Sequence, residues 1–190
     1  CRTLGLGRQD RVALVLPNGP EMAAAFVALC VAATCAPLNP RYREEDFEFA
    51  FTDFGVRTVV VQAGVASPAR DVARTLGLPV IELNPQPELG CGAFRLEAEP
   101  FGPATSPGPS CAQDVALVLH TSGTTARPKI VPLSQANLTG AMRGVAGALE
   151  LTCDDRCLNV MPLFHANALQ FVLMASLWAG VIVVYPPEYS

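Results

Sequence analysis

The residues best suited to chemistry in this chain form one short hydroxyl-rich stretch. Within nine residues it carries four hydroxyl side chains, one glycine and one lysine, namely Thr121, Ser122, Gly123, Thr124, Thr125 and Lys129. Small residues let backbone N–H groups approach a ligand, hydroxyls donate further hydrogen bonds, and the lysine supplies a positive charge. Together these groups suit the binding of a polyphosphate.

The hydroxyl-rich stretch lies between two apolar segments, 115–119 and 130–133, that have the composition of short strands. The predicted order is therefore strand, loop, lysine, strand. This is not the Walker phosphate loop, because Ile130 follows the lysine where that loop requires Ser or Thr. A Ser/Thr-rich surface turn is the alternative interpretation.

A second candidate residue is His165, at the end of the apolar segment 158–165 and directly before a predicted helix over 168–179. A histidine between a strand and a helix can line a pocket. Taken by itself, a structural role for His165 is the simpler alternative.

The elements that must position these residues alternate between strand and helix patterns. We expect strands at 11–16, 58–61 and 79–83, and helices at 21–33, 44–54 and 68–76. This alternation predicts an α/β fold with doubly wound, mostly parallel sheets and flanking helices. After the hydroxyl-rich stretch, a helix capped by Ser134 contains three glycines, which lower its stability by about 1 kcal/mol each relative to alanine.

Proline marks the expected domain boundary. Segment 84–111 contains six prolines and is predicted to be a surface loop or linker. It separates a first α/β segment, 1–83, from 112–190, which contains the hydroxyl-rich stretch and would be a truncated second α/β segment.

Composition excludes several classes of protein. The 190 residues are 51% hydrophobic and 16% charged, which is typical of a globular chain. The net charge is −4 and no basic run exists, so no nucleic-acid partner is expected. The apolar stretch 168–185 is interrupted by Gly180, which favours a buried helix and strand over a membrane span.

The seven cysteines do not form a metal-binding pattern. Cys153 and Cys157 lack a second pair and a nearby histidine, so no zinc or other metal residues are predicted. Reduced thiols in a cytoplasmic protein are the favoured interpretation.

The stretch from Thr121 to Lys129 resembles the signature loop of the AMP-forming (adenylate-forming) superfamily, T-S-G-T-T-G-x-P-K-G. That superfamily includes acyl-CoA synthetases, luciferases and peptide-synthetase adenylation domains. Pro162-Leu-Phe-His165 is similar to its second motif, P-L-F-H-x-x-G. Ala126, Ile130 and Ala168 stand where the motifs have glycine, and the resemblance implies that the methyl of Ala168 would narrow the acyl pocket.

The resemblance also covers the segments 10–21 and 36–43, and within the superfamily the chain is most similar to the oxalate–CoA ligase branch. It implies the incomplete N-terminal portion of the ligase fold, acting with ATP, Mg²⁺ and CoA on a small carboxylic acid. The signature loop would hold the β- and γ-phosphates, and His165 would position the carboxylate and the α-phosphate. Lys129 and His165 would be the catalytic residues.

In members of the superfamily, the magnesium-binding glutamate and the adenine contacts lie in later motifs, beyond Ser190. The expected partner is therefore the missing C-terminal part of the ligase. The alternative is a catalytically incomplete product with a binding or regulatory role, or none. The 190-residue chain alone is expected to be inactive. A cytoplasmic location is expected, although a peroxisomal signal would lie outside the chain.

Overall fold

The computed structural model describes residues 4–100, 102–104, 106–121 and 128–186. It contains a seven-stranded sheet in the order β5-β4-β3-β1-β2-β6-β7, with a separate pair, β8-β9. The strands are β1 Arg11–Val15, β2 Thr34–Pro37, β3 Thr58–Gln62, β4 Val80–Pro85, β5 Phe94–Glu97, β6 Val115–His120, β7 Ile130–Ser134, β8 Arg156–Leu158 and β9 Ile182–Val184.

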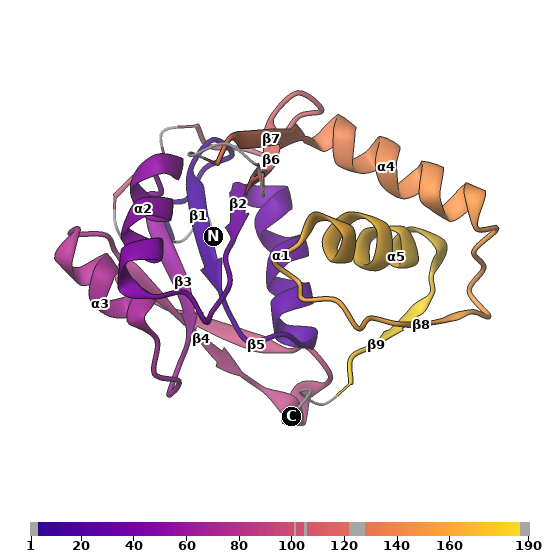
Figure 1. Ribbon diagram of the computed structural model, residues 1–190, viewed down its shortest axis with the longest axis horizontal. Helices are drawn as coiled ribbons and strands as arrows, with labels where there is room; N and C mark the ends of the chain where they lie inside the picture. The colour runs from indigo at the N-terminus through magenta and orange to yellow at the C-terminus, as the bar shows by residue number, and fades with distance from the viewer. Residues whose placement is uncertain (1–3, 101, 105, 122–127, 187–190) are drawn as a thin grey trace.

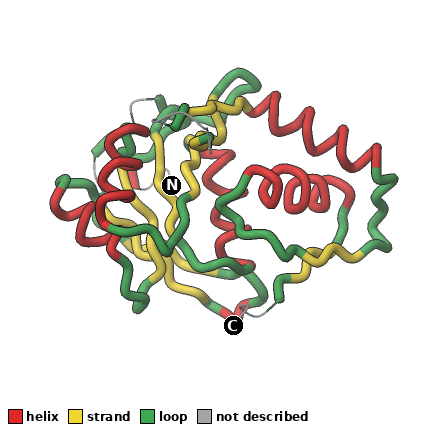
Figure 2. Tube along the Cα trace, in the orientation of Figure 1, coloured by secondary structure: helices red, strands yellow, loops and turns green. Residues whose placement is uncertain are grey.

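Helices cover both faces of the large sheet, as Figures 1 and 2 show. They are α1 Pro20–Ala32, α2 Glu44–Phe54, α3 Pro68–Thr75, the 3₁₀ turn η2 Pro87–Leu89, α4 Gln135–Ala148, the π-helix η3 Asn167–Met174 and α5 Ala175–Ala179. Strands β1 to β4 and β6 are parallel, whereas β5 and β7 pair antiparallel with β4 and β6. The predicted α/β class with a mostly parallel, doubly wound sheet is confirmed.

Strand β1 shows how the sheet divides the interior into two cores. Val12 and Leu14 point to the α1-side core, and Ala13 and Val15 point to the α2-side core. All four side chains are buried, because β1 has a parallel neighbour at each edge and helices over each face. The unbroken apolar run that predicted this strand follows from burial on both faces.

The remaining elements lie beyond α1, on the side away from the sheet (Figure 1). We call β8, β9, η3 and α5 the outer region. Leu169 and Leu173 of η3 and Leu138 of α4 join the α1-side core, which attaches the outer region to the sheet. Strands β8 and β9 pair with each other in parallel.

Two local predictions need correction. The proline-rich segment 84–111 contains a strand, β5, which pairs Leu96 with Leu83 of β4. The strand expected over 158–165 is wrong. The observed strand, β8, covers Arg156–Leu158 and shares only Leu158 with the expected one. The helix expected over 168–179 is confirmed by η3 and α5, although η3 has π-helical hydrogen bonding.

The proline-rich segment also lies close against the start of the chain. The Arg8 backbone N–H donates to the Ser106 carbonyl at 3.1 Å. A Cβ added to Gly5 would lie 1.7 Å from the Gly102 carbonyl oxygen, so only glycine permits this approach. The large sheet spans the boundary expected at residue 111, since β6 pairs with β2 at Cys35 and Leu117.

The described residues contain no helix long and apolar enough to cross a membrane. In the same part of the chain the six cysteines are free thiols. Burial raises the pKa of the Cys35 thiol well above its ordinary value, and the neighbouring Cys30 acts in the same direction.

Candidate active site

The two ends of the hydroxyl-rich loop are held side by side by strands β6 and β7. The last ladder pair of these antiparallel strands is His120 with Ile130. Beyond it, the Thr121 backbone N–H donates to the Lys129 carbonyl at 2.9 Å, and the Lys129 N–H donates to the Thr121 hydroxyl at 3.2 Å. The two strands predicted on either side of the loop are therefore confirmed.

Of the six residues predicted to bind phosphate, the structure describes Thr121 and Lys129, at the base of the loop. Ser122, Gly123, Thr124 and Thr125 lie outside the described residues, as does Ala126. Lys129 is exposed, and the structure records no ion pair of its ammonium group with any described residue. Its side chain can therefore be directed to a ligand without breaking a described ion pair.

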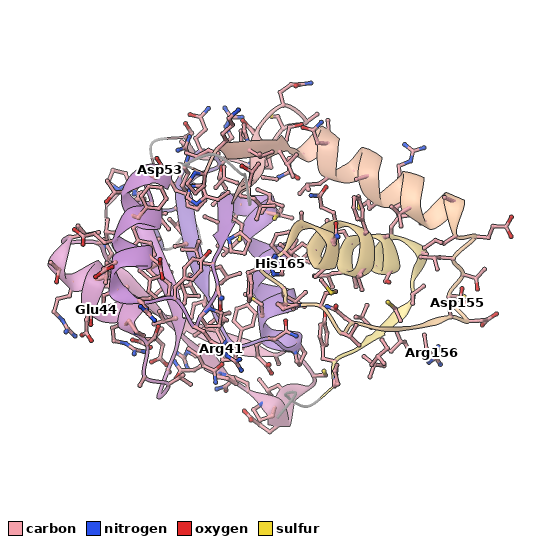
Figure 3. The ribbon with its side chains drawn as sticks, in the orientation of Figure 1. Arg41, Glu44, Asp53, Asp155, Arg156 and His165 are labelled. Carbon is pink, nitrogen blue, oxygen red and sulfur yellow. The ribbon has the colours of Figure 1, made fainter. Side chains whose placement is uncertain are left out.

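His165 lies in the turn that leads into η3, near the centre of Figure 3. Its backbone N–H donates to Pro162 at 3.1 Å, and its carbonyl accepts from Leu169 at 3.1 Å. The imidazole is exposed and lies against Phe164, with ring centroids 4.6 Å apart. The backbone is thus fixed while the ring remains accessible to a ligand.

A cleft of about 450 Å³ adjoins the His165 motif. It opens at the carboxyl ends of β1 and β2, which is where open α/β sheets bind ligands. Its walls come from both strand ends and from the segment before His165: Leu16, Pro17, Asn18, Met22, Asn39, Pro40, Arg41, Asn159, Val160, Pro162, Leu163, Phe164 and Pro186. The cleft therefore combines an apolar wall with several amide groups and one guanidinium.

Asn18 is a positioning residue that the sequence did not single out. Its side-chain oxygen accepts a hydrogen bond from the Leu163 backbone N–H at 2.8 Å, across 145 residues of sequence. This bond fixes the His165 motif against the end of β1. The only sequence signal was the turn Pro17-Asn18-Gly19-Pro20 directly after a buried strand.

Ala168 stands where the second motif has glycine. It is fully buried in the α1-side core and does not line the cleft. Its methyl group therefore fills the core beneath η3. Ile130 is half-buried in β7 against the α2-side core, so its side chain is used in packing.

The C-terminal wall of the cleft is tied to strand β9. The fully buried Asn159 donates its backbone N–H to Val184 at 2.9 Å, and its side-chain oxygen accepts from Met161 at 3.0 Å. Burial raises the pKa of nearby Tyr185 to about 12, although the Asn159 amide favours the ionised phenol. Within the described residues no three His, Cys, Asp or Glu side chains gather to hold a metal ion.

Comparison with known proteins gives one consistent family. Residues 2–190 match the family described as AMP-binding enzyme. The oxalate–CoA ligases of Saccharomyces cerevisiae and Arabidopsis thaliana are each 34% identical to this chain, over 96% of its length. The chain spans only 38% and 36% of those two relatives.

Solved structures give the same result. ATP-bound MatB from Rhodopseudomonas palustris matches 98% of this chain with a TM-score of 0.77 and 25% identity, and the match covers 37% of that protein. The N-terminal domain of FACL13 from Mycobacterium tuberculosis matches 98% of the chain with a TM-score of 0.71 and 25% identity, covering 46% of that domain. The chain therefore has the fold of the first part of these proteins.

Proposed function

Because the chain belongs to the AMP-binding enzyme family, we propose that it is the N-terminal part of an ATP-dependent, AMP-forming acid–CoA ligase. The two oxalate–CoA ligases named above act, by their names, on oxalate and CoA. In the proposed reaction a carboxylate attacks the α-phosphate of ATP, which forms an acyl-adenylate and releases pyrophosphate. The thiol of CoA then attacks the acyl carbon, and AMP leaves.

The base of the loop is the observation that carries this proposal. Thr121 and Lys129 are joined by two hydrogen bonds, and the lysine is exposed beside the loop. A lysine fixed at this point can neutralise charge on the β- and γ-phosphates and on the departing pyrophosphate. Ser122, Gly123, Thr124 and Thr125 would supply the remaining donors of the same loop.

His165 is the proposed second catalytic residue. Its exposed ring adjoins a cleft at the carboxyl ends of β1 and β2, and the Asn18–Leu163 bond fixes the backbone of its motif. We assign it the task of holding the carboxylate substrate near the α-phosphate. Among the described residues, the structure records no hydrogen bond or ion pair between His165 and the base of the loop.

Magnesium, when bound with ATP, would neutralise negative charge on the phosphates. Mg²⁺ commonly takes most of its ligands from phosphates and water and only one or two from protein carboxylates. We propose that the protein ligand of the magnesium lies in another part of the ligase. We propose that this missing C-terminal part is also needed to complete the CoA site.

The second candidate, a catalytically incomplete product, is favoured by one observation. The outer region exposes large apolar side chains, including Phe171, Trp178 and Ile182 at 45%, 53% and 51%. Such a surface suits contact with further protein. An isolated 190-residue chain would then bind nucleotide weakly and would not complete the reaction.

The test measures MgATP binding by calorimetry to the unchanged chain, to Lys129→Ala and to Arg156→Ala. Each variant loses one positive charge, but Arg156 lies in the outer region at the right of Figure 3. Loss of a charge-assisted contact to phosphate should weaken binding about tenfold or more for Lys129→Ala only. Equal affinities for the two variants would contradict the phosphate site.

A further inference from the structure

Strand β6 carries the first limb of the proposed phosphate loop. It pairs along its length with β7, which carries the second limb, but it has little support from β2 on its other side. It pairs with β2 only at Leu117, opposite Cys35. Its first residues are held further, since Thr34 donates its hydroxyl to the Val115 carbonyl at 2.6 Å and the Cys30 thiol contacts the Ala116 carbonyl at 3.5 Å. Neither the pairing with β2 nor these two contacts holds the end of β6 where the loop begins.

Besides its pairing with β7, that end is held by His120, whose side chain reaches helix α2. The His120 Nε2 lies 2.8 Å from an Asp53 carboxylate oxygen. The imidazole stacks on Phe54 with ring centroids 4.0 Å apart and planes 19° apart, and Phe49 lies 5.5 Å from it on a tilted plane. One side chain thus joins the strand to the last turn of α2 through a polar contact and a ring stack.

Helix α2 is a rigid support for this contact. Phe47, Phe51 and Phe54 are almost fully buried in the α2-side core, and Gly55 ends the helix with φ 60°. The Arg11 guanidinium also donates to the Phe54 carbonyl at 2.6 Å, which ties the helix end to β1. Figure 3 labels Asp53 at the end of α2 that His120 contacts.

We infer that His120 is a positioning residue that fixes the first limb of the phosphate loop on helix α2 through Asp53 and Phe54. This inference rests on the proposed function of that loop. His120 directly precedes Thr121, so a displacement of the His120 ring would also displace the two hydrogen bonds that join Thr121 to Lys129. Displacing a catalytic group by about 1 Å can lower the reaction rate by up to about 100-fold. The contacts that fix the position of the loop are therefore expected to affect function.

The experiment compares Asp53→Ala and His120→Phe with the unchanged chain. His120→Phe keeps a ring against Phe54 but loses the contact with Asp53. The matched control is Asp71→Ala, which removes an exposed ion pair of the same length, 2.8 Å to Arg74, on helix α3. Two properties are measured for each protein: hydrogen exchange at the Thr121 amide, and the affinities for MgATP and for AMP.

We expect faster exchange at the Thr121 amide and about tenfold weaker MgATP binding in both site variants, with AMP affinity unchanged. The Val59 amide, which donates to Pro79, should keep its protection and so report an intact sheet. The double variant should lose no more than either single variant, because both remove the same contact.

Two failures can be told apart. If the unchanged chain and Lys129→Ala bind MgATP equally well, or neither binds it, the proposed function of the loop is refuted. If Lys129→Ala weakens MgATP binding while Asp53→Ala and His120→Phe change neither the Thr121 exchange nor the MgATP affinity, the positioning role of His120 is refuted. Equal losses of MgATP and AMP affinity would also refute the positioning role. They would indicate a general structural defect, which does not discriminate between ligands with and without the β- and γ-phosphates.

Discussion

Three phenylalanines beside the β1–β4 part of the sheet and two aromatic residues of the outer region differ sharply in exposure. Phe47, Phe51 and Phe54 of α2 are at most 1% exposed, whereas Phe171 and Trp178 of the outer region are 45% and 53% exposed. Strands β1 and β3 have a neighbour at each edge, but within the part of the chain that the structure describes β8 and β9 pair only with each other. The first region therefore completes its own core, and the outer region does not.

The difference follows from the physics of parallel strands. Parallel sheets are normally covered on both faces, and a pair of strands is not stable by itself in water. In the outer region Leu158, Ile182 and Val184 remain exposed along the β8–β9 pair. Since the chain spans 38% of a matched oxalate–CoA ligase, we propose that further strands of the ligase would cover this pair.

The largest expected effect on stability comes from replacing one phenylalanine by alanine in each of the two regions. Phe51→Ala should lower the free energy of unfolding by about 3–5 kcal/mol, because it leaves a cavity among buried side chains. Phe171→Ala should lower it by less than about 0.5 kcal/mol, because the ring is 45% exposed. Urea denaturation of both variants provides the measurement, and similar losses would show that the outer region packs more tightly in solution.

The pH dependence of stability should show whether Tyr185 is buried in solution. This residue directly follows β9 and packs against the α1-side core. Burial raises its pKa from 10.0 to about 12 in the folded chain. The unfolded chain therefore loses this proton first, and stability present below pH 10 declines as pH rises from about 10 to about 12. Tyr185→Phe should flatten this part of the stability curve.

The corresponding test in the first region is Tyr42→Phe, since burial and the nearby Asp46 charge raise the pKa of Tyr42 as well. Stability is followed by thermal denaturation between pH 8 and pH 12. An unchanged decline in Tyr185→Phe would mean that this phenol is exposed in solution and that β9 is loosely attached.

The same comparison explains what could be predicted from the sequence. Helix α2 was predicted with the correct bounds because its phenylalanines recur at helical spacing and Gly55 adopts the left-handed conformation that ends it. Strand β5 was missed because its support is a distant partner, Leu83 opposite Leu96, within a proline-rich segment. The extent of β8 was misjudged because the apolar run 158–165 indicated a buried strand, whereas Leu158, Val160 and Met161 are exposed.

The candidate site divides in the same way. Thr121 and Lys129 could be found from the motif, because a phosphate loop depends on residue types close together in sequence. The Asn18–Leu163 bond joins residues 145 apart, and the His120–Asp53 contact joins residues 67 apart. Both depend on how elements pack in space, and no local pattern in one sequence reports that.

The smallest expected effect concerns α4, the helix that packs on η3 and α5. Gly144 is exposed within it, and a Cβ added there would meet no atom within 4 Å. Gly144→Ala should therefore raise the free energy of unfolding by about 0.5–1 kcal/mol, through helix propensity alone. Gly180→Ala is the control and should destabilise, because Gly180 ends α5 with φ 75°. Both changes are measured by urea denaturation. A loss of stability in Gly144→Ala would show that another backbone approaches α4 closely in solution, and the outer region would then be more complete than its exposed side chains indicate.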